Sequence, residues 1–156
     1  MSSNVMHEIL MRATENMPMR QIEIGGETYL QRYFVRADAD GTQHWLHRFV
    51  RDDDERYMHT HPWTAYARLL VGRYTERTPA GDRNYAAGEV NYITPDKAHR
   101  IITVKPDTWT LMTVLPGRCE AWHFLGDNEG DHVEMKSSPT DWWKSCGVRG
   151  SETHCQ

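Results

Sequence analysis

Two histidines stand one residue apart in the segment HTHPW, residues 59–63. In a strand, residues i and i+2 share a face, so His59 and His61 can direct both imidazoles toward one metal ion. His99 is the third candidate, because it begins the strand-like segment HRIITV after the turn TPDK. The chain has 9 histidines, so an HxH pair also arises by chance. The spacing alone does not separate a metal site from ordinary histidines.

Strand alternation selects further residues expected to face an interior. In QHWLHRFV, Trp45, His47 and Phe49 share a face. We assign His47 a role as a proton-transfer group or fourth ligand, with a hydrogen-bonded interior histidine as the alternative. In CEAWHFL, His123 shares a face with Cys119, and we expect it to reach substrate.

Aromatic and basic side chains complete the predicted site. Tyr66 is expected to act as a phenol donor, although aromatic residues in strands usually serve packing. Trp63 and Trp109, with Trp45, are expected to make the cavity wall apolar. Arg73 is the arginine we expect to point inward and bind a substrate carboxylate or phosphate.

The elements that must position these residues are short strands between Gly, Pro and Asp turns. The predicted strands lie near residues 21–24, 27–36, 43–50, 58–61, 65–76, 89–93, 99–104, 109–115 and 119–125. This pattern favours a sandwich or barrel. The acidic run 52–55 is expected to be a solvated loop, with a hard-cation site as the alternative, and SPTDWWK a short helix.

Ahead of the strands, residues 3–16 predict an amphipathic helix capped by Ser3 and ended by Pro18. Its apolar positions Met6, Ile9 and Leu10 recur at helical spacing. We therefore expect one compact domain at residues 19–144, preceded by a helical segment at 1–18 and followed by a flexible tail at 145–156.

Composition narrows the function classes. The net charge of −4 and pI near 6.1 give no basic field for nucleic acid or an acidic membrane. The sequence lacks a signal-peptide pattern, a long apolar span and a phosphate-binding loop. The three cysteines, Cys119, Cys146 and Cys155, have no CxxC spacing and fit a reducing compartment. We expect a cytoplasmic protein that acts on a small molecule.

The histidine motifs resemble those of the cupin superfamily, whose first motif runs HxH, Glu, Gly and whose second runs Gly, Pro, His. The matching residues are His59, His61 and Gly72 in the first motif and Gly88, Pro95 and His99 in the second, with the proline one place late. Ala65 stands where the family carries its glutamate. The segments LHRFVRDDDERYMHTHPW and LLVGRYTE are similar to a subgroup of small bacterial and phage cupins.

This resemblance implies an all-β fold, a double-stranded β-helix or jelly-roll barrel with an N-terminal helix. It implies a divalent metal on His59, His61 and His99; Fe(II) is favoured, and Zn, Ni or Mn also suit imidazoles. Three-histidine cupins include dioxygenases, so we expect an Fe(II)-dependent dioxygenase. The alternatives are a metal-dependent isomerase, epimerase or lyase, and a non-catalytic binding cupin without a catalytic metal. We expect a homodimer.

Overall fold

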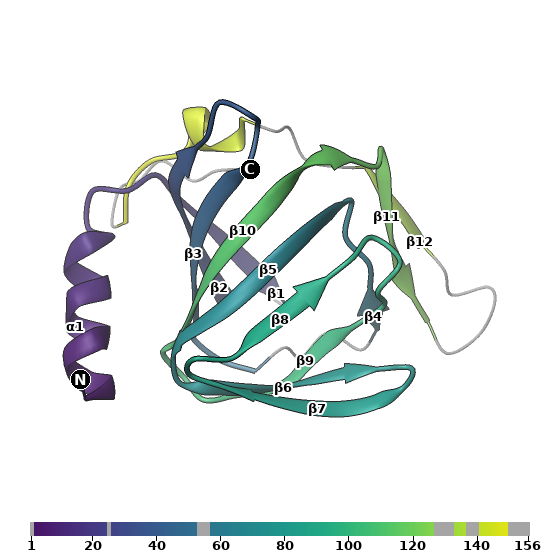
Figure 1. Cartoon of the computed structure of the whole chain (residues 1–156), viewed down its shortest axis with the longest axis horizontal. Coiled ribbons are helices and arrows are strands. Elements are labelled where there is room, and N and C mark those ends of the chain that lie inside the picture. Colours follow the sequence, from purple (N-terminus) through teal and green to yellow (C-terminus); the bar gives the residue numbers. More distant parts are fainter. Residues whose placement is uncertain (1, 25, 53–56, 127–132, 137–140, 150–156) are drawn as a thin grey trace.

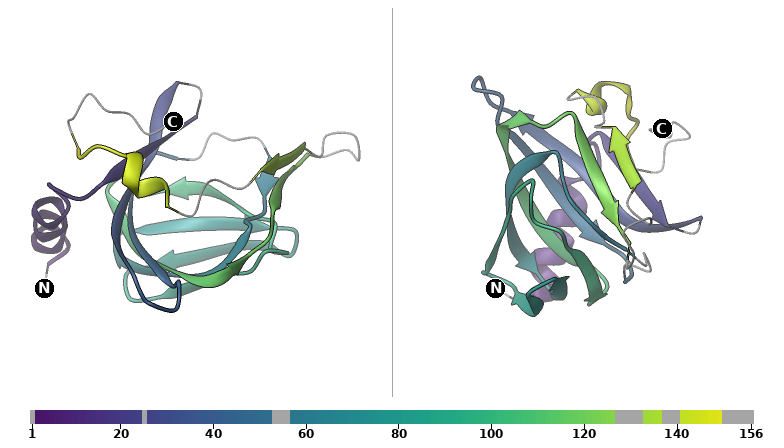
Figure 2. Two further views of the ribbon diagram at one scale, coloured as in Figure 1. Left: turned by 90° about the horizontal axis from the view of Figure 1, so that it is seen from above. Right: turned by 90° about the vertical axis from the view of Figure 1, so that its right-hand side faces the viewer.

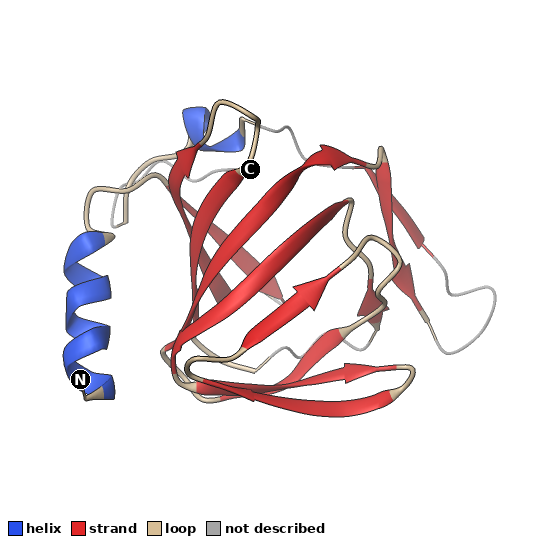
Figure 3. Ribbon diagram, in the orientation of Figure 1, coloured by secondary structure: helices blue, strands red, loops and turns tan. Residues whose placement is uncertain are grey.

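The computed structural model describes residues 2–24, 26–52, 57–126, 133–136 and 141–149. Strands dominate this part of the chain (Figure 3). The elements are α1 (Ser3–Ala13), β1 (Met19–Ile24), β2 (Glu27–Ala37), β3 (Gln43–Phe49), β4 (Met58–His59), β5 (Trp63–Val71), β6 (Arg73–Thr78), β7 (Gly81–Ala86), β8 (Val90–Ile93), β9 (Arg100–Val104), β10 (Thr108–Arg118), β11 (Ala121–Leu125), β12 (Val133–Lys136) and the 3-10 turn η2 (Trp142–Ser145).

The strands form three antiparallel sheets around one interior (Figure 1). The largest has six strands in the order β1-β2-β3-β10-β5-β8, and the two smaller sheets have the orders β7-β6-β9 and β12-β11-β4. Seen from above, the large sheet curves around the interior, and β11 lies across from β1 and β2 (Figure 2). The predicted all-β jelly-roll class is confirmed, with the sheets leaving the barrel open.

Alternation along the strands builds the core. On β5 the side chains alternate between buried and more exposed from Trp63 to Val71, as a sheet with one covered face requires. Two buried apolar clusters fill the barrel. The first contains Tyr29, Leu30, Phe49, Leu69, Tyr74, Tyr85, Ile101 and Val104. The second contains Trp45, Trp63, Ala65, Ala67, Ile93, Met112 and Val114.

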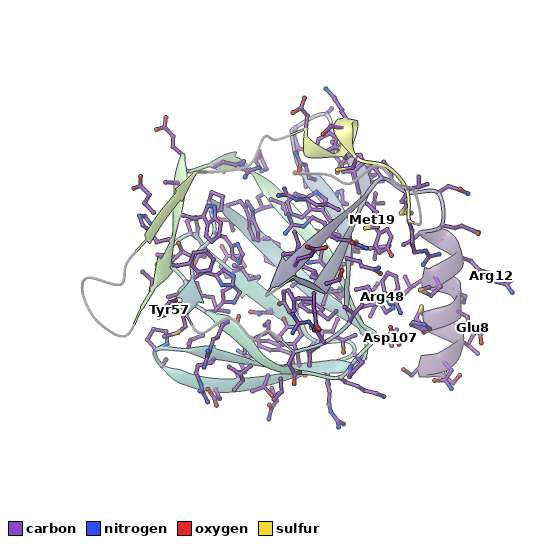
Figure 4. All side chains as sticks on the ribbon, turned by 180° about the vertical axis from the view of Figure 1, so that it is seen from behind. Glu8, Arg12, Met19, Arg48, Tyr57 and Asp107 are labelled. Atoms are coloured by element: carbon purple, nitrogen blue, oxygen red, sulfur yellow. The ribbon has the colours of Figure 1, made fainter. Side chains whose placement is uncertain are left out.

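Helix α1 lies against the outer face of the large sheet (Figure 1). Leu10 is buried there in a third cluster with Tyr33 and Trp109. The cap is Ser2, whose hydroxyl accepts a hydrogen bond from Val5 N at 3.4 Å, and the expected cap at Ser3 was wrong by one residue. Ile9, predicted to pack, is 46% exposed. Figure 4 shows that Glu8 and Arg12 point away from the sheet.

Gly72 divides the single strand predicted at 65–76 into β5 and β6. Its φ of +81° lies in the left-handed region, and a Cβ there would stand 2.2 Å from Thr108 Oγ1. Only glycine fits this corner without strain. The strands β7 and β12 were not predicted, because their sequences are polar and β7 has five exposed residues of six. At Gly72 the chain leaves the large sheet and continues as β6 in the sheet β7-β6-β9.

Part of the expected tail is held in place. Met19 N donates to Gly147 O at 2.8 Å, Val148 bridges to Pro18, and Arg149 Nη2 donates to Met11 O at 2.8 Å. Residues 147–149 of the predicted tail thus contact the N-terminal segment, and residues 150–156 lie outside the described part.

Two further sequence expectations concern the cysteines and the acidic run. Cys119 is a free thiol, whereas Cys146 is disulfide-bonded, which the expectation of reduced cysteines did not include. Residues 53–55 of the acidic run fall outside the described residues, as does position 56. Within the described part, no helix is long and apolar enough to cross a membrane.

Candidate metal centre

A two-residue backbone pairing brings His59 and His99 together. His59 N donates to His99 O at 2.9 Å, and His99 N donates to His59 O at 3.0 Å. The pairing is an isolated antiparallel bridge between the end of β4 and the residue before β9. His61 follows two residues after His59, so residues 40 positions apart in sequence share one face of the barrel.

The three imidazoles converge on a common point. One ring nitrogen from each of His59, His61 and His99 lies within 4.8 Å of the others, and these three residues form the metal-ligating cluster found among the described residues. The Nε2 atoms of His61 and His99 are 2.9 Å apart. Two ring nitrogens each about 2.1 Å from a metal ion, at a right angle, would be about 3 Å apart. The spacing therefore fits two adjacent coordination positions.

The interior keeps the rings of His59 and His61 neutral, which is the form that binds metals. Burial, reinforced by His99, lowers the pKa of His59 to about 3. Burial, and then the neighbouring histidines and Arg32, hold the pKa of His61 well below its ordinary value of 6.5. His59 Nδ1 is buried and has no hydrogen-bond partner among the described residues. A buried polar atom normally has a partner, so this nitrogen is available to a bound ligand or ion.

The carboxylate of Glu76 orients the imidazole of His99, the third candidate ligand. Its Oε1 accepts a hydrogen bond from His99 Nδ1, which leaves the opposite nitrogen, Nε2, facing His61. Burial raises the pKa of this carboxyl, but the hydrogen bonds from His99, Lys97 and Asn91 outweigh it, and the pKa falls to about 2. An ionised carboxylate only accepts, so His99 Nδ1 must donate and Nε2 carries the free lone pair.

The carboxylate is itself fixed by a buried polar network. Lys97 Nζ donates to Glu76 Oε2 and to Asn91 Oδ1, both at 2.7 Å. Asn91 Nδ2 donates to Glu76 Oε1 at 2.8 Å and to Tyr74 OH at 3.0 Å. Because Glu76 is 1% exposed and tied on several sides, it holds one position. The sequence analysis assigned no role to Glu76, which is the last residue of the segment LLVGRYTE.

The histidines open into a cavity of about 360 Å³ inside the barrel. Trp63 stacks on His61 with ring centroids 4.1 Å apart, and Trp122 and Phe124 contact the ring of His59. Other apolar lining residues are Tyr29, Leu30, Trp45, Phe49, Ile93, Ile101 and Met112. The volume and apolar wall are those of a small-molecule site.

Solved structures share this architecture. An RmlC-like cupin protein from Ralstonia eutropha JMP134 aligns with a TM-score of 0.54 and 19% identity, covering 82% of this chain and 75% of that one. A cupin-2 domain from Rhodospirillum rubrum aligns with a TM-score of 0.56 and 12% identity, over 74% and 78% of the two chains. The chain therefore has the cupin fold.

A DMSP lyase structure also shares the cupin fold, with a TM-score of 0.59 and 15% identity over 87% of this chain and 70% of that one. No protein-family model matches the sequence. No curated protein matches it either. At these identities the likeness establishes the fold alone, and the chemistry of this protein must be inferred from its own residues.

Three predicted substrate or catalytic residues face the cavity: Trp45, His47 and Trp63. Burial, and next Arg32, keep the pKa of His47 well below 6.5. Its Nε2 accepts a hydrogen bond from Arg32 Nε at 3.1 Å. His47 lies outside the metal-ligating cluster, and its imidazole is already engaged.

Four other predicted residues lie elsewhere, so their expected inward placement was wrong. Tyr66 is 43% exposed and packs on Tyr92 outside the barrel, since Ala65 takes the inward position of β5. Arg73 is exposed beyond the Gly72 corner. Trp109 is fully buried on the opposite face of the sheet, where its Nε1 donates to His7 of α1 at 3.1 Å.

His123 also points away from the cavity. Its Nε2 lies 3.5 Å from a Glu134 oxygen, and the side chain is half exposed. Trp122 and Phe124, the neighbours on β11, line the cavity instead. The side chains of β11 alternate as predicted, but the set that faces the cavity is the opposite of the predicted set.

The polar lining residues that the sequence analysis missed include Arg20, Arg32, Thr110 and Arg118. Arg32 and Thr110 lie within predicted strands, whereas Arg20 and Arg118 lie just outside them. Only the pairing of strands brings them together, so no local signal marked them.

Proposed function

We propose that this cupin is a metal-dependent enzyme in which His59, His61 and His99 hold Fe(II) and a small molecule is oxygenated. The observation that carries the proposal is the convergence of three ring nitrogens within 4.8 Å on the wall of an apolar cavity. Three protein ligands on one side leave coordination positions for substrate and oxygen. Ala65 in the usual glutamate position leaves the ligand set without an acidic member.

Bound Fe(II) supplies the capacity to activate oxygen. The residues of the chain supply the rest. Glu76 keeps His99 in the tautomer that presents Nε2. Trp63 against His61, and Trp122 against His59, cover the ligand rings and keep bulk water from them. Other divalent ions that bind imidazole, such as Zn, Ni or Mn, would occupy the same three nitrogens.

Oxygenation is favoured over isomerase, epimerase or lyase chemistry because, apart from the three candidate ligands, the described lining residues offer no buried base that is unengaged; His47 Nε2 already accepts from Arg32 Nε. Proton abstraction requires a basic group within hydrogen-bond reach of substrate. Among the described lining residues, Glu23 is the carboxylate, and it is exposed. Glu76 is held by His99 and Lys97. The fold neighbours include both a DMSP lyase and the Fe(II) protein HppE, so the fold does not choose between these reactions.

Nitric oxide binding to the iron-loaded protein tests the proposal without a known substrate. Protein reconstituted anaerobically with Fe(II) should give the EPR signal of a high-spin Fe–NO complex, because NO occupies an open position as oxygen would. The His61→Ala variant should lose the signal, while His44→Ala, which removes a largely buried histidine that pairs with Asp38 away from the cavity lining, should keep it. A wild-type protein that binds Fe(II) but gives no NO complex would rule out an oxygenase and favour a non-catalytic metal site.

A further inference from the structure

A row of polar side chains crosses the inner face of the large sheet. Arg20 of β1 stands opposite Arg32 of β2, Arg32 stands opposite His47 of β3, and His47 stands opposite Thr110 of β10. All four line the cavity that holds the histidine cluster. Strand pairing therefore assembles a continuous polar band on an otherwise apolar wall.

The band is strongly positive. Two guanidinium groups directly opposite each other on neighbouring strands repel. Arg118 lies close enough to add to this repulsion, and burial with both arginines lowers the pKa of Arg32 to about 9. Four arginines and one glutamate line the cavity altogether. A bound anion would relieve this concentration of like charge.

Two contacts fix the orientation of Arg32. Its Nε donates to His47 Nε2 at 3.1 Å, and its guanidinium carbon lies 4.6 Å from the centroid of the Trp45 ring. A guanidinium held in one plane is suited to a carboxylate, because its parallel N–H groups match the two oxygens. His47 therefore serves as a positioning residue for Arg32.

Thr110 adds a hydroxyl that calls for a partner. The residue is 1% exposed, and Thr110 Oγ1 is buried with no hydrogen-bond partner among the described residues. Buried hydroxyls are normally paired. A ligand atom that accepts a hydrogen bond, bound in the cavity beside Arg20 and Arg32, would pair with this hydroxyl.

We propose that the arginine row, Arg20 and Arg32 with Thr110, binds the carboxylate of a small organic acid whose apolar body lies against the tryptophans of the cavity. This inference rests on the proposed function, since it names the class of substrate presented to the same metal centre. Arg32 and the three histidines line the same cavity, so an acid held by Arg32 shares that cavity with the candidate metal centre. Arg73, the arginine predicted to bind substrate, lies outside this row.

Calorimetric titration with phenylacetate and its neutral analogue phenylacetamide tests the inference. The two probes share shape and apolar surface and differ in charge. The wild-type protein should bind phenylacetate at least about tenfold more tightly, the difference expected for a charge-assisted hydrogen bond over a neutral one. Arg32→Gln should remove most of that preference. Thr110→Val, nearly isosteric, should weaken phenylacetate binding severalfold without changing phenylacetamide.

A matched control and a second arginine keep the result interpretable. Arg36→Gln alters another arginine of β2 whose side chain is 66% exposed, and it should leave both affinities unchanged. Arg20→Gln relieves the repulsion opposite Arg32, so this variant should fold at least as well as wild type while binding phenylacetate less tightly.

Titrations of metal-loaded and chelated protein separate the two proposals. Preference for phenylacetate in both forms, lost in Arg32→Gln, supports the carboxylate site even if no metal binds. Metal binding with equal affinity for the two probes would overturn the carboxylate site and leave the metal centre standing. Loss of the preference in Arg36→Gln as large as in Arg32→Gln would also overturn it, because the effect would then be one of net charge.

Discussion

Glu76 and His99 form a buried carboxylate–imidazole pair in which the carboxylate faces Nδ1 and the candidate metal position faces Nε2. The glutamate of the cupin motif, where this chain has Ala65, is thus not replaced among the candidate ligands. A carboxylate from the next strand, β6, instead sets the tautomer and direction of one ligand. Such supporting pairs commonly tune metal affinity.

Glu76→Gln should weaken metal binding by about 10- to 100-fold while leaving the three ligands in place. The amide keeps the shape of the side chain but removes the charge that favours His99 with its proton on Nδ1, and it leaves Lys97 without its ionic partner. Competition of the protein with a fluorescent chelator for Zn would measure the affinity. Asp82→Asn, which neutralises an exposed carboxylate paired with Arg77, should bind as wild type. Equal affinities in both variants would show that Glu76 does not support the site.

The metal-free protein should lose stability as the pH falls below about 6.5. In the unfolded chain His59 takes up a proton near its ordinary pKa of 6.5, whereas in the folded chain its pKa is about 3. The unfolded state therefore binds more protons between these values, so acidification favours unfolding. His61 and His47 shift in the same direction.

Glu76 extends this dependence to lower pH. Its folded pKa of about 2 lies below its ordinary 4.5, so the stability it contributes is present above 4.5 and lost as the pH falls toward 2. Urea unfolding of chelated protein at pH 7.5, 6, 5 and 4 would measure the slope. His59→Gln should flatten the part between pH 6.5 and 5. A midpoint that is constant from pH 7.5 to 5 would contradict neutral, buried histidines.

Gly72→Ala should destabilise the protein by several kcal/mol, because the left-handed backbone conformation costs about 1–2 kcal/mol and the new Cβ meets Thr108 at 2.2 Å. Gly88→Ala is the matched control. Gly88 also has a positive φ, +96°, but no atom lies within 4 Å of its Cβ position, so this variant should show the backbone cost alone. Denaturant unfolding of the two variants compares them. Equal losses would mean that close contact with Thr108 does not constrain the corner.

Local patterns predicted much of the architecture and part of the site. The HxH spacing and the composition around His99 are properties of short segments, and alternation placed Trp45 and His47 correctly on one face. Alternation gives two possible phases, however, and tertiary packing chooses between them. For β11 the predicted phase was reversed, and Trp122 faces the cavity where His123 was expected.

Other errors arose because the sequence does not show which strands pair or which faces of a sheet are covered by other elements. Trp109 was expected to face the cavity. Its side chain instead lies on the other face of β10, which α1 covers. The sequence does not reveal Glu76 as a partner of His99, because the two side chains meet only after the chain turns at Gly72 and continues as β6. The pairing of Arg20 with Arg32 depends on the register of β1 and β2. These relationships exist only between strands, so residue spacing along one strand cannot reveal them.

The central claim, that His59, His61 and His99 hold a divalent metal, is tested most directly by elemental analysis of protein purified without chelators or a histidine tag. Wild-type protein and His44→Ala should each contain close to one metal ion per chain, with iron expected for an oxygenase. His61→Ala should contain almost none while keeping a folded circular dichroism spectrum. Equal metal content in wild type and His61→Ala, or a wild-type protein that holds no metal even after incubation with Fe(II), would contradict the account.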